Sequence, residues 1–370
     1  MRLLSLLFVS LCLFPAELIP VTSPAIYFSP YNTDSDGNGP VGPNNVRTGS
    51  TRASWIYAGA YLKTRFTGSS ASLRIDIRSM NPAGAPPKFR WTVDGGPMQT
   101  TQAAASATTL DLANGLPPGT HTLQLFLAAT DANYDRWQKP EQVVHIEGLL
   151  LDEGATAMAP EHIASRRAIF FGDSITEGAW VLGNSNRVVN RKYVDWVAHS
   201  DATQAWPRYL AEVLDVEFGL CGSGGMSWLR GSHAGIPGLP ESWRFHYKDR
   251  PRSFTPAPDF VFVNMGTNDG PRDTAAAAAQ WLRDVRQAIP APAEIVVIVP
   301  FAQTGKAHLE QAAQSAGDKH VQVVDLGPRW SRGIRKYGTP TLESHDGLHP
   351  NVEANGLFAA LLAAALASRL

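Results

Sequence analysis

The sequence contains little cysteine and little charge. Only Cys12 and Cys221 occur among 370 residues, charged residues make up 18% of the chain, and the formal net charge is −1. So few cysteines exclude a disulfide-stapled scaffold. The low charge density gives no support for a nucleic-acid partner or a polybasic membrane patch. A chain of this length is sufficient for two domains, each with its own hydrophobic core.

The N-terminus carries one short apolar run. It covers residues 3–15, follows Arg2, and is too short to span a bilayer as a stable helix. This pattern predicts a signal peptide over residues 1–25, with cleavage before Ile26 after a pair of small residues at positions 23 and 25; a site near Ala16 is the alternative. We therefore expect a secreted or periplasmic protein without a membrane anchor.

A second apolar run, residues 168–171, leads into Gly172-Asp173-Ser174. A continuous apolar stretch is typical of a buried parallel strand, and chemistry in open α/β sheets takes place just beyond the carboxyl ends of such strands. Ser174 is therefore a candidate nucleophile. The alternative for this segment alone is a serine that only caps a helix.

A serine nucleophile requires a base, and the base works best when a third group orients it. Asp346 and His349 stand three residues apart near the C-terminus, in a segment interrupted by Gly347 and Pro350. A tight loop at this spacing can turn the carboxylate back toward the imidazole. A zinc site using His345 and His349 is disfavoured, because that motif needs a continuous helix and a glutamate after the first histidine.

Two further segments offer groups that can stabilise an oxyanion. Asn268 lies just beyond the apolar run 260–263, and its amide is a candidate donor. Glycines after the apolar run 216–218 allow a main-chain N–H to point into a site; Gly222 is the assigned donor and Gly224 the alternative.

The same glycine-rich segment invites two other interpretations. A dinucleotide-binding loop is disfavoured, because Ser227 holds the position of the last glycine in that motif. Cys221 is a second nucleophile candidate, although a small buried side chain under the loop is the more ordinary interpretation.

Together these segments resemble the SGNH (GDSL-type) hydrolase superfamily over roughly residues 165–370. The first block matches Gly172–Gly178, the third matches Gly266–Asp269, and the fifth matches Asp346–Pro350. The resemblance implies a flavodoxin-like three-layer α/β domain and no cofactor. It also implies a catalytic triad, an oxyanion hole and no metal, with the following residues: Ser174, Asp346 and His349 as catalytic residues, and Ser174, Gly222 and Asn268 around the oxyanion.

The two halves of the chain differ in their hydrophobic pattern. Residues 26–151 hold short alternating runs that predict a small, jelly-roll-like β-sandwich. Residues 152–166 read as a linker, and residues 167–370 alternate between strand and helix, with five parallel strands expected. The expected helices cover Thr203–Leu214, Thr274–Ile289 and Glu353–Leu370.

A small β-sandwich before an SGNH domain is similar to carbohydrate esterase family 2. This resemblance implies removal of acetyl groups from an acetylated polysaccharide or oligosaccharide. Trp180 and Trp228 lie close to Ser174 and Gly222 in the sequence and are candidate walls of a sugar or acyl pocket, the alternative being core packing. Two other functions remain open: a GDSL-type lipase or thioesterase acting on lipid esters, and a secreted glycan-binding protein without catalysis.

Overall fold

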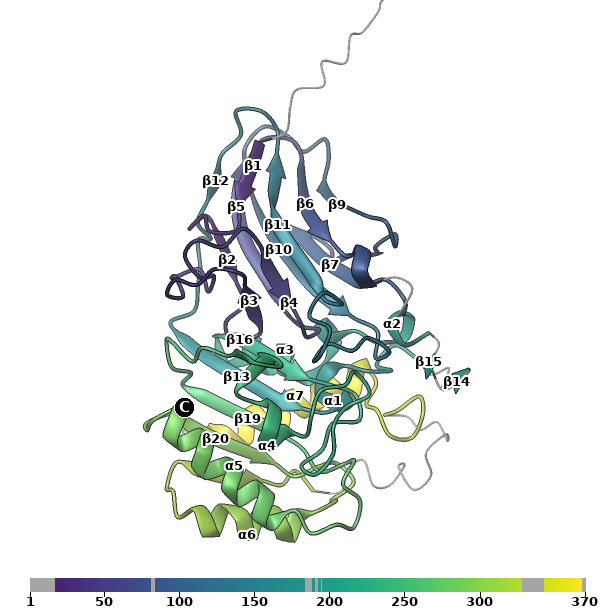
Figure 1. Cartoon of the computed structure of the whole chain (residues 1–370), viewed down its shortest axis with the longest axis vertical. Coiled ribbons are helices and arrows are strands. Elements are labelled where there is room, and N and C mark those ends of the chain that lie inside the picture. The colour runs from purple at the N-terminus through teal and green to yellow at the C-terminus, as the bar shows by residue number, and fades with distance from the viewer. Residues whose placement is uncertain are drawn as a thin grey trace, which may run out of the picture.

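The computed structural model describes residues 17–80, 84–183, 188–189, 192–193, 195–327 and 343–367. Two parts follow one another along the chain: an antiparallel β-sandwich and a parallel sheet flanked by helices (Figure 1). The expected fold class, a flavodoxin-like three-layer α/β domain with a five-stranded parallel sheet, preceded by a small β-sandwich, is confirmed.

The sandwich consists of two sheets of six strands each. One has the order β3-β4-β11-β6-β9, with β1 also paired to β11, and the other has the order β12-β5-β10-β7-β8, with β2 also paired to β5. The strands of the first sheet are β1 (Glu17–Pro20), β3 (Thr33–Ser35), β4 (Ala53–Trp55), β6 (Ala71–Asp76), β9 (Thr109–Ala113) and β11 (Val144–Leu151). Those of the second are β2 (Ile26–Phe28), β5 (Tyr61–Thr67), β7 (Lys88–Val93), β8 (Gln99–Gln102), β10 (Thr120–Ala129) and β12 (Ala157–Met158).

Alternation of buried and exposed positions explains why these strands form a sandwich. In β6 the buried residues Ala71, Leu73 and Ile75 alternate with more exposed ones. The period of two places one face of the strand in the core between the sheets and the other toward solvent. Phe28 and Trp55, from opposite sheets, meet edge to face in that core.

The sandwich begins earlier and ends later than the sequence analysis expected. Residues 17–20 form β1, and Val21 is completely buried, so the expected boundary before Ile26 lies inside a packed segment. The assigned linker contains β12, which pairs with β5. Both segments are short and polar in places, and their pairing with distant strands is not visible in their own pattern.

The second part holds a parallel sheet with the order β16-β13-β19-β20-β21. Its strands are β13 (Arg166–Gly172), β16 (Val216–Gly222), β19 (Phe260–Asn264), β20 (Glu294–Ile298) and β21 (Val321–Val324). The first strand in the chain therefore lies second in the sheet, which is the flavodoxin-like arrangement. All five strands are parallel, and β16 is added on one side of β13, whereas β19, β20 and β21 follow on its other side. A ligand is expected at that switch point, beyond the strands' carboxyl ends.

Helices cover both faces of this sheet. Side chains at alternate positions of the strands pack in one cluster with α5 (Ala275–Ala288) and α6 (Lys306–Ala316), and in another with α3 (Trp206–Leu214) and α7 (Val352–Leu366). The expected helices correspond to α3, α5 and α7, whereas α6 was not expected. The remaining short elements are α1 (Ser174–Glu177), α2 (Trp196–His199), α4 (Leu239–Ser242), η1 (Arg78–Met80), η2 (Ala202–Gln204), β14 (Val188–Val189), β15 (Lys192–Tyr193), β17 (Phe245–Tyr247) and β18 (Arg250–Pro251).

The two parts are packed against each other and share buried side chains. Tyr31, Ile56 and Tyr57 of the sandwich share one buried cluster with strands of the parallel sheet. Polar contacts cross the same boundary: the Glu217 carboxylate accepts a hydrogen bond from the Tyr61 hydroxyl at 2.5 Å and pairs with the Lys63 ammonium at 2.7 Å. The sandwich is thus a fixed part of the molecule.

Candidate active site

Ser174 is placed by the end of the central strand. β13 ends at Gly172, and Ser174 opens the short helix α1, where the Asp173 side chain accepts a hydrogen bond from the Ile175 N–H at 3.0 Å. Asp173 is therefore the residue that caps the helix. A Cβ atom added to Gly172 would lie 2.0 Å from the Thr176 hydroxyl oxygen, so only glycine fits this tight turn.

Ser174 lies in a hydrogen-bonded chain with His349 and Asp346. Its Oγ is 2.9 Å from His349 Nε2, and His349 Nδ1 is 2.6 Å from Asp346 Oδ2. All three side chains are buried; Asp346 has no exposed surface. These distances are within the range for a nucleophile joined to a base, and for a base joined to the acid that orients it.

The loop that carries Asp346 and His349 is organised by the carboxylate itself. Asp346 Oδ1 accepts hydrogen bonds from the N–H groups of Leu348 at 2.9 Å and His349 at 2.8 Å, and from the Ser344 hydroxyl. Gly347 takes a φ of +77°, a left-handed conformation that glycine adopts easily. The aspartate thus folds the loop and orients the imidazole at once.

Two carboxyl groups beside the serine have opposite shifts in pKa. Burial alone would raise the pKa of Asp346, but the hydrogen bond and charge of His349, with the backbone N–H donors, outweigh burial and lower it to about 2. Burial raises the pKa of Asp173 to about 6, despite its hydrogen bond from Ile175. Asp346 is therefore the carboxylate that stays ionised.

Asn268 lines the cavity beside the serine, as the sequence analysis expected. Its Nδ2 donates to the Met226 carbonyl at 3.0 Å and to Asp173 Oδ2 at a longer 3.3 Å. The first bond holds the amide in place. The second is long enough to yield to a stronger acceptor in the cavity.

The glycine-rich segment is arranged differently from the expectation. Gly222 lies inside β16, paired in register with Gly172, and the Gly224 N–H donates to the Glu177 carboxylate at 2.7 Å. Neither residue lines the cavity. Gly225 does, with a φ of +80°. The expected donor Gly222 and its alternative Gly224 thus lie away from the cavity, because the strand continues to Gly222 and the loop begins after it.

A cavity of about 330 Å³ adjoins the serine. Its lining residues come from five separate segments of the chain: Ser174, Trp180, Trp196, Gly225, His233, Asn268, Leu348 and His349. Trp180 and Trp196 meet edge to face at 5.3 Å between ring centroids, and burial lowers the pKa of His233, with Arg230 and His349 adding to the effect. The lining of the cavity therefore combines aromatic side chains with polar ones.

The two candidate tryptophans have different positions. Trp180 lines the cavity, as expected for a pocket wall. Trp228 instead packs in the core against Trp281, and its Nε1 donates to the Met265 carbonyl at 3.2 Å. The expected role of Trp228 in substrate binding is thus corrected, since its ring is buried in the core and does not line the cavity.

Trp196, His233 and Leu348 were not found from the sequence. Leu348 lies between Gly347 and His349, so its place in the fifth block was an available signal. Trp196 opens the short helix α2 and His233 lies in a loop; neither belongs to a sequence motif, and only the fold brings them to the serine.

Other chemistry suggested by the sequence finds no support here. Burial raises the pKa of Cys221 to about 11, which keeps this thiol protonated and unreactive. Within the described ranges no group of three or more His, Cys, Asp or Glu side chains is arranged to hold a metal ion. Nor does any helix in the same ranges have the length and apolarity to cross a bilayer.

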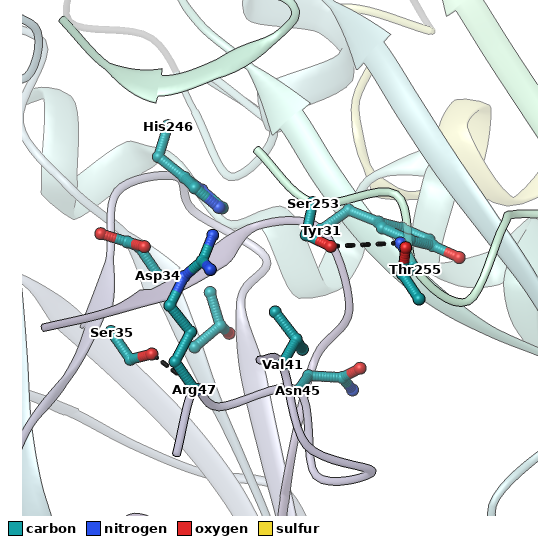
Figure 2. A pocket seen from close by; sticks show the side chains of 10 residues that line it. Tyr31, Asp34, Ser35, Val41, Asn45, Arg47, His246, Ser253 and Thr255 are labelled. Atoms are coloured by element: carbon teal, nitrogen blue, oxygen red, sulfur yellow. Dashed lines mark hydrogen bonds between the residues drawn. The ribbon is translucent and has the colours of Figure 1, made fainter. Parts of the chain in front are cut away.

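A second cavity lies between the two parts of the molecule. Figure 2 shows Asp34 and Arg47 of the sandwich beside His246 of the hydrolase part. Its volume is about 20 Å³, roughly enough for one water molecule. This cavity is too small for a substrate, and its lining excludes Ser174, Asn268 and His349.

Sheet order, strand-end serine and N-terminal sandwich together define an α/β protein of the SGNH type. The family model described as GDSL-like Lipase/Acylhydrolase matches residues 170–357, and that of the carbohydrate esterase 2 N-terminal domain matches residues 46–160. The chain belongs to the GDSL-like lipase/acylhydrolase family and is a carboxylic ester hydrolase.

Several solved structures have a similar fold over nearly the whole chain. A family two carbohydrate esterase from Cellvibrio japonicus has a TM-score of 0.72 at 16% identity, covering 95% of this chain and 97% of its own. A family two esterase from Clostridium thermocellum, solved in complex with cellohexaose, has a TM-score of 0.69 at 20% identity, with coverages of 93% and 98%. The acetyl xylan esterase Est2A from Butyrivibrio proteoclasticus has a TM-score of 0.68 at 14% identity, with coverages of 96% and 98%. No curated protein matches the sequence.

Proposed function

We propose that this protein is a secreted serine esterase that removes acetyl groups from carbohydrate. The observation that carries the proposal is the continuous hydrogen-bonded chain from Ser174 through His349 to Asp346 at the edge of a cavity. A buried carboxylate with a pKa near 2 holds the imidazole with Nδ1 protonated. Nε2 is then free to accept the serine proton.

The reaction has two steps. Ser174 Oγ attacks the ester carbonyl while His349 takes its proton, and the imidazolium then protonates the leaving alcohol as the C–O bond breaks. Water attacks the acyl-serine with His349 again as base, which releases the acid and restores the serine. The oxyanion is held by Asn268 Nδ2, the Ser174 N–H and, on our assignment, the Gly225 N–H.

The proposal of a carbohydrate substrate is supported by the similarity of both parts of the chain to carbohydrate esterases. The N-terminal model is that of carbohydrate esterase 2, and the structural relatives include an acetyl xylan esterase and an enzyme solved with cellohexaose. The short acyl group is supported by the bulky rings of Trp180 and Trp196, which meet edge to face and line the cavity beside Ser174. Export is supported by the apolar run at residues 3–15.

A series of p-nitrophenyl esters tests the acyl preference. We expect kcat/KM to fall steeply from acetyl to butyryl and to reach background at octanoyl. Each methylene that fits gains only about 0.8 kcal/mol of burial, and a clash in a closed pocket costs more than that gain. The Ser174→Ala variant should lose several orders of magnitude in kcat.

Polymer substrates test the carbohydrate assignment. We expect acetate release from acetylated xylan or glucomannan by the wild type and none by Ser174→Ala. Turnover that rises with acyl chain length, without acetate release from either polymer, would favour a lipase or thioesterase. No turnover of any ester would favour a glycan-binding protein.

A further inference from the structure

One side chain of the sandwich reaches the loop that borders the active-site cavity. Arg136 lies between β10 and β11, and its side chain is completely buried. Its backbone N–H donates to the Ala234 carbonyl of the hydrolase part at 3.0 Å, and Nη1 donates to the Ile56 carbonyl at 3.2 Å. Backbone and side chain are both anchored, so the guanidinium has a defined direction.

The guanidinium is directed at two residues beside the nucleophile. Nη2 donates to Glu177 Oε1 at 3.1 Å and to the Ser223 hydroxyl at 3.2 Å. Glu177 is the last residue of α1, which Ser174 opens, and its side chain is 2% exposed. Its other oxygen, Oε2, accepts the Gly224 N–H at 2.7 Å. Arg136 and Glu177 thus hold two consecutive residues of the loop, and the next residue, Gly225, lines the cavity.

The loop depends on Glu177 being ionised. A carboxylate accepts from the guanidinium on one oxygen and from the Gly224 N–H on the other. Burial raises the pKa of Glu177, while the Arg136 charge and the hydrogen bonds from Gly224 and Arg136 oppose the rise. Asp131 is the other charged group that acts on it, and it also raises the pKa. Arg136 is therefore the cation that opposes the effect of burial and favours the charged form of this acid.

We propose that Arg136 is a positioning residue for ester hydrolysis: by holding Glu177 and Ser223, it sets the Ser223–Gly225 loop against the nucleophile. The sandwich then contributes to turnover itself, in addition to any part in binding the polymer. This inference rests on the proposed Ser174 mechanism. It extends that mechanism to a residue that touches neither the substrate nor the reacting atoms.

Kinetics of Arg136→Met on p-nitrophenyl acetate test the proposal. We expect kcat to fall about 10- to 100-fold at pH 6 with little change in KM, because the oxyanion donors are misplaced while the cavity remains. Loss of the guanidinium raises the pKa of Glu177 further, so kcat should recover as the pH rises and the acid ionises. This recovery adds a new limb to the plot of kcat against pH. A purely structural role for Arg136 would not produce that limb.

Three further variants complete the test. The double variant Arg136→Met/Glu177→Gln should show the reduced kcat without the new pH limb, since a glutamine carbonyl accepts from Gly224 at every pH. Arg136→Lys, which keeps the charge, should lie between wild type and Arg136→Met and also lack the limb. If Arg136→Met does not fold, the single variants Arg136→Lys and Glu177→Gln test the proposal in its place. A wild-type kcat in both of them would overturn the proposal.

Lys63→Met is the matched control. It breaks another ion pair between the two parts of the molecule, from Lys63 to the buried Glu217, and neither residue lines the active-site cavity. We expect wild-type kcat and pH profile. Equal losses in Lys63→Met and Arg136→Met would overturn the proposal in favour of general domain docking, as would an unchanged Arg136→Met. A wild type inactive on every ester would instead refute the proposed function.

Discussion

The Asp346→Asn variant tests the orientation of His349 most directly, because the surroundings of Asp346 dictate how an asparagine must sit. Oδ1 accepts from two backbone N–H groups and from the Ser344 hydroxyl, so the amide oxygen must take that position. The NH₂ group then occupies the place of Oδ2 and donates to His349 Nδ1. The imidazole is forced into the tautomer with its proton on Nε2, facing Ser174, and cannot accept the serine proton.

The size of the loss in kcat follows from this change of the His349 tautomer. A base held in the wrong tautomer costs a serine triad about 10⁴ in kcat, which corresponds to about 5.5 kcal/mol of transition-state stabilisation. KM should change little, because Asp346 is completely buried and does not line the cavity. The prediction is thus a large loss confined to kcat.

Steady-state hydrolysis of p-nitrophenyl acetate measures this loss, with circular dichroism to confirm folding. The chain offers a matched control in Asp94→Asn, since the Asp94 carboxylate accepts from His121 at 2.7 Å in the sandwich, remote from the serine. We expect wild-type kcat for that variant. A loss below tenfold in a folded Asp346→Asn protein would refute the tautomer argument and indicate that Ser174 and His349 suffice.

Three further predictions concern the oxyanion hole, the buried acid and the N-terminal strand. Asn268→Ala should lower kcat about 10²–10³-fold at constant KM, whereas an unchanged kcat would reduce Asn268 to its structural bond with Met226. In the folded protein the pKa of Asp173 is about 6, against an ordinary 3.8, so between about pH 4 and 6 the folded state holds a proton that the unfolded state has released. The free energy of unfolding, measured with urea, should therefore fall as the pH rises through this range, and the Asp173→Asn variant should lack this fall. The same dependence of unfolding free energy on pH in wild type and variant would contradict the prediction. A protein beginning at Ile26 should melt below one beginning at Glu17, because it loses β1 and the buried Val21 side chain, worth about 1.5–3 kcal/mol; equal melting temperatures would show that β1 adds no stability.

Local patterns in the sequence were sufficient for the fold class and for the residues at strand ends. Continuous apolar runs that lead into polar residues and glycine predict buried parallel strands, and β13 and β19 each end one residue beyond those runs. Parallel strands bring their carboxyl ends to one edge, so Ser174 and Asn268 were expected to meet there. The short spacing of Asp346 and His349 within a glycine- and proline-interrupted loop predicted their contact in the same way.

Only the tertiary structure decided which side chains surround the serine. Trp180 and Trp228 are equally close to motif residues in the sequence, yet one lines the cavity and the other packs against Trp281. Likewise, nothing near Arg136 in the chain indicates that it reaches Glu177. Strand and helix periods are read over a few neighbouring residues, whereas these contacts depend on how segments distant in the sequence pack, and burial between them selects the direction of each side chain.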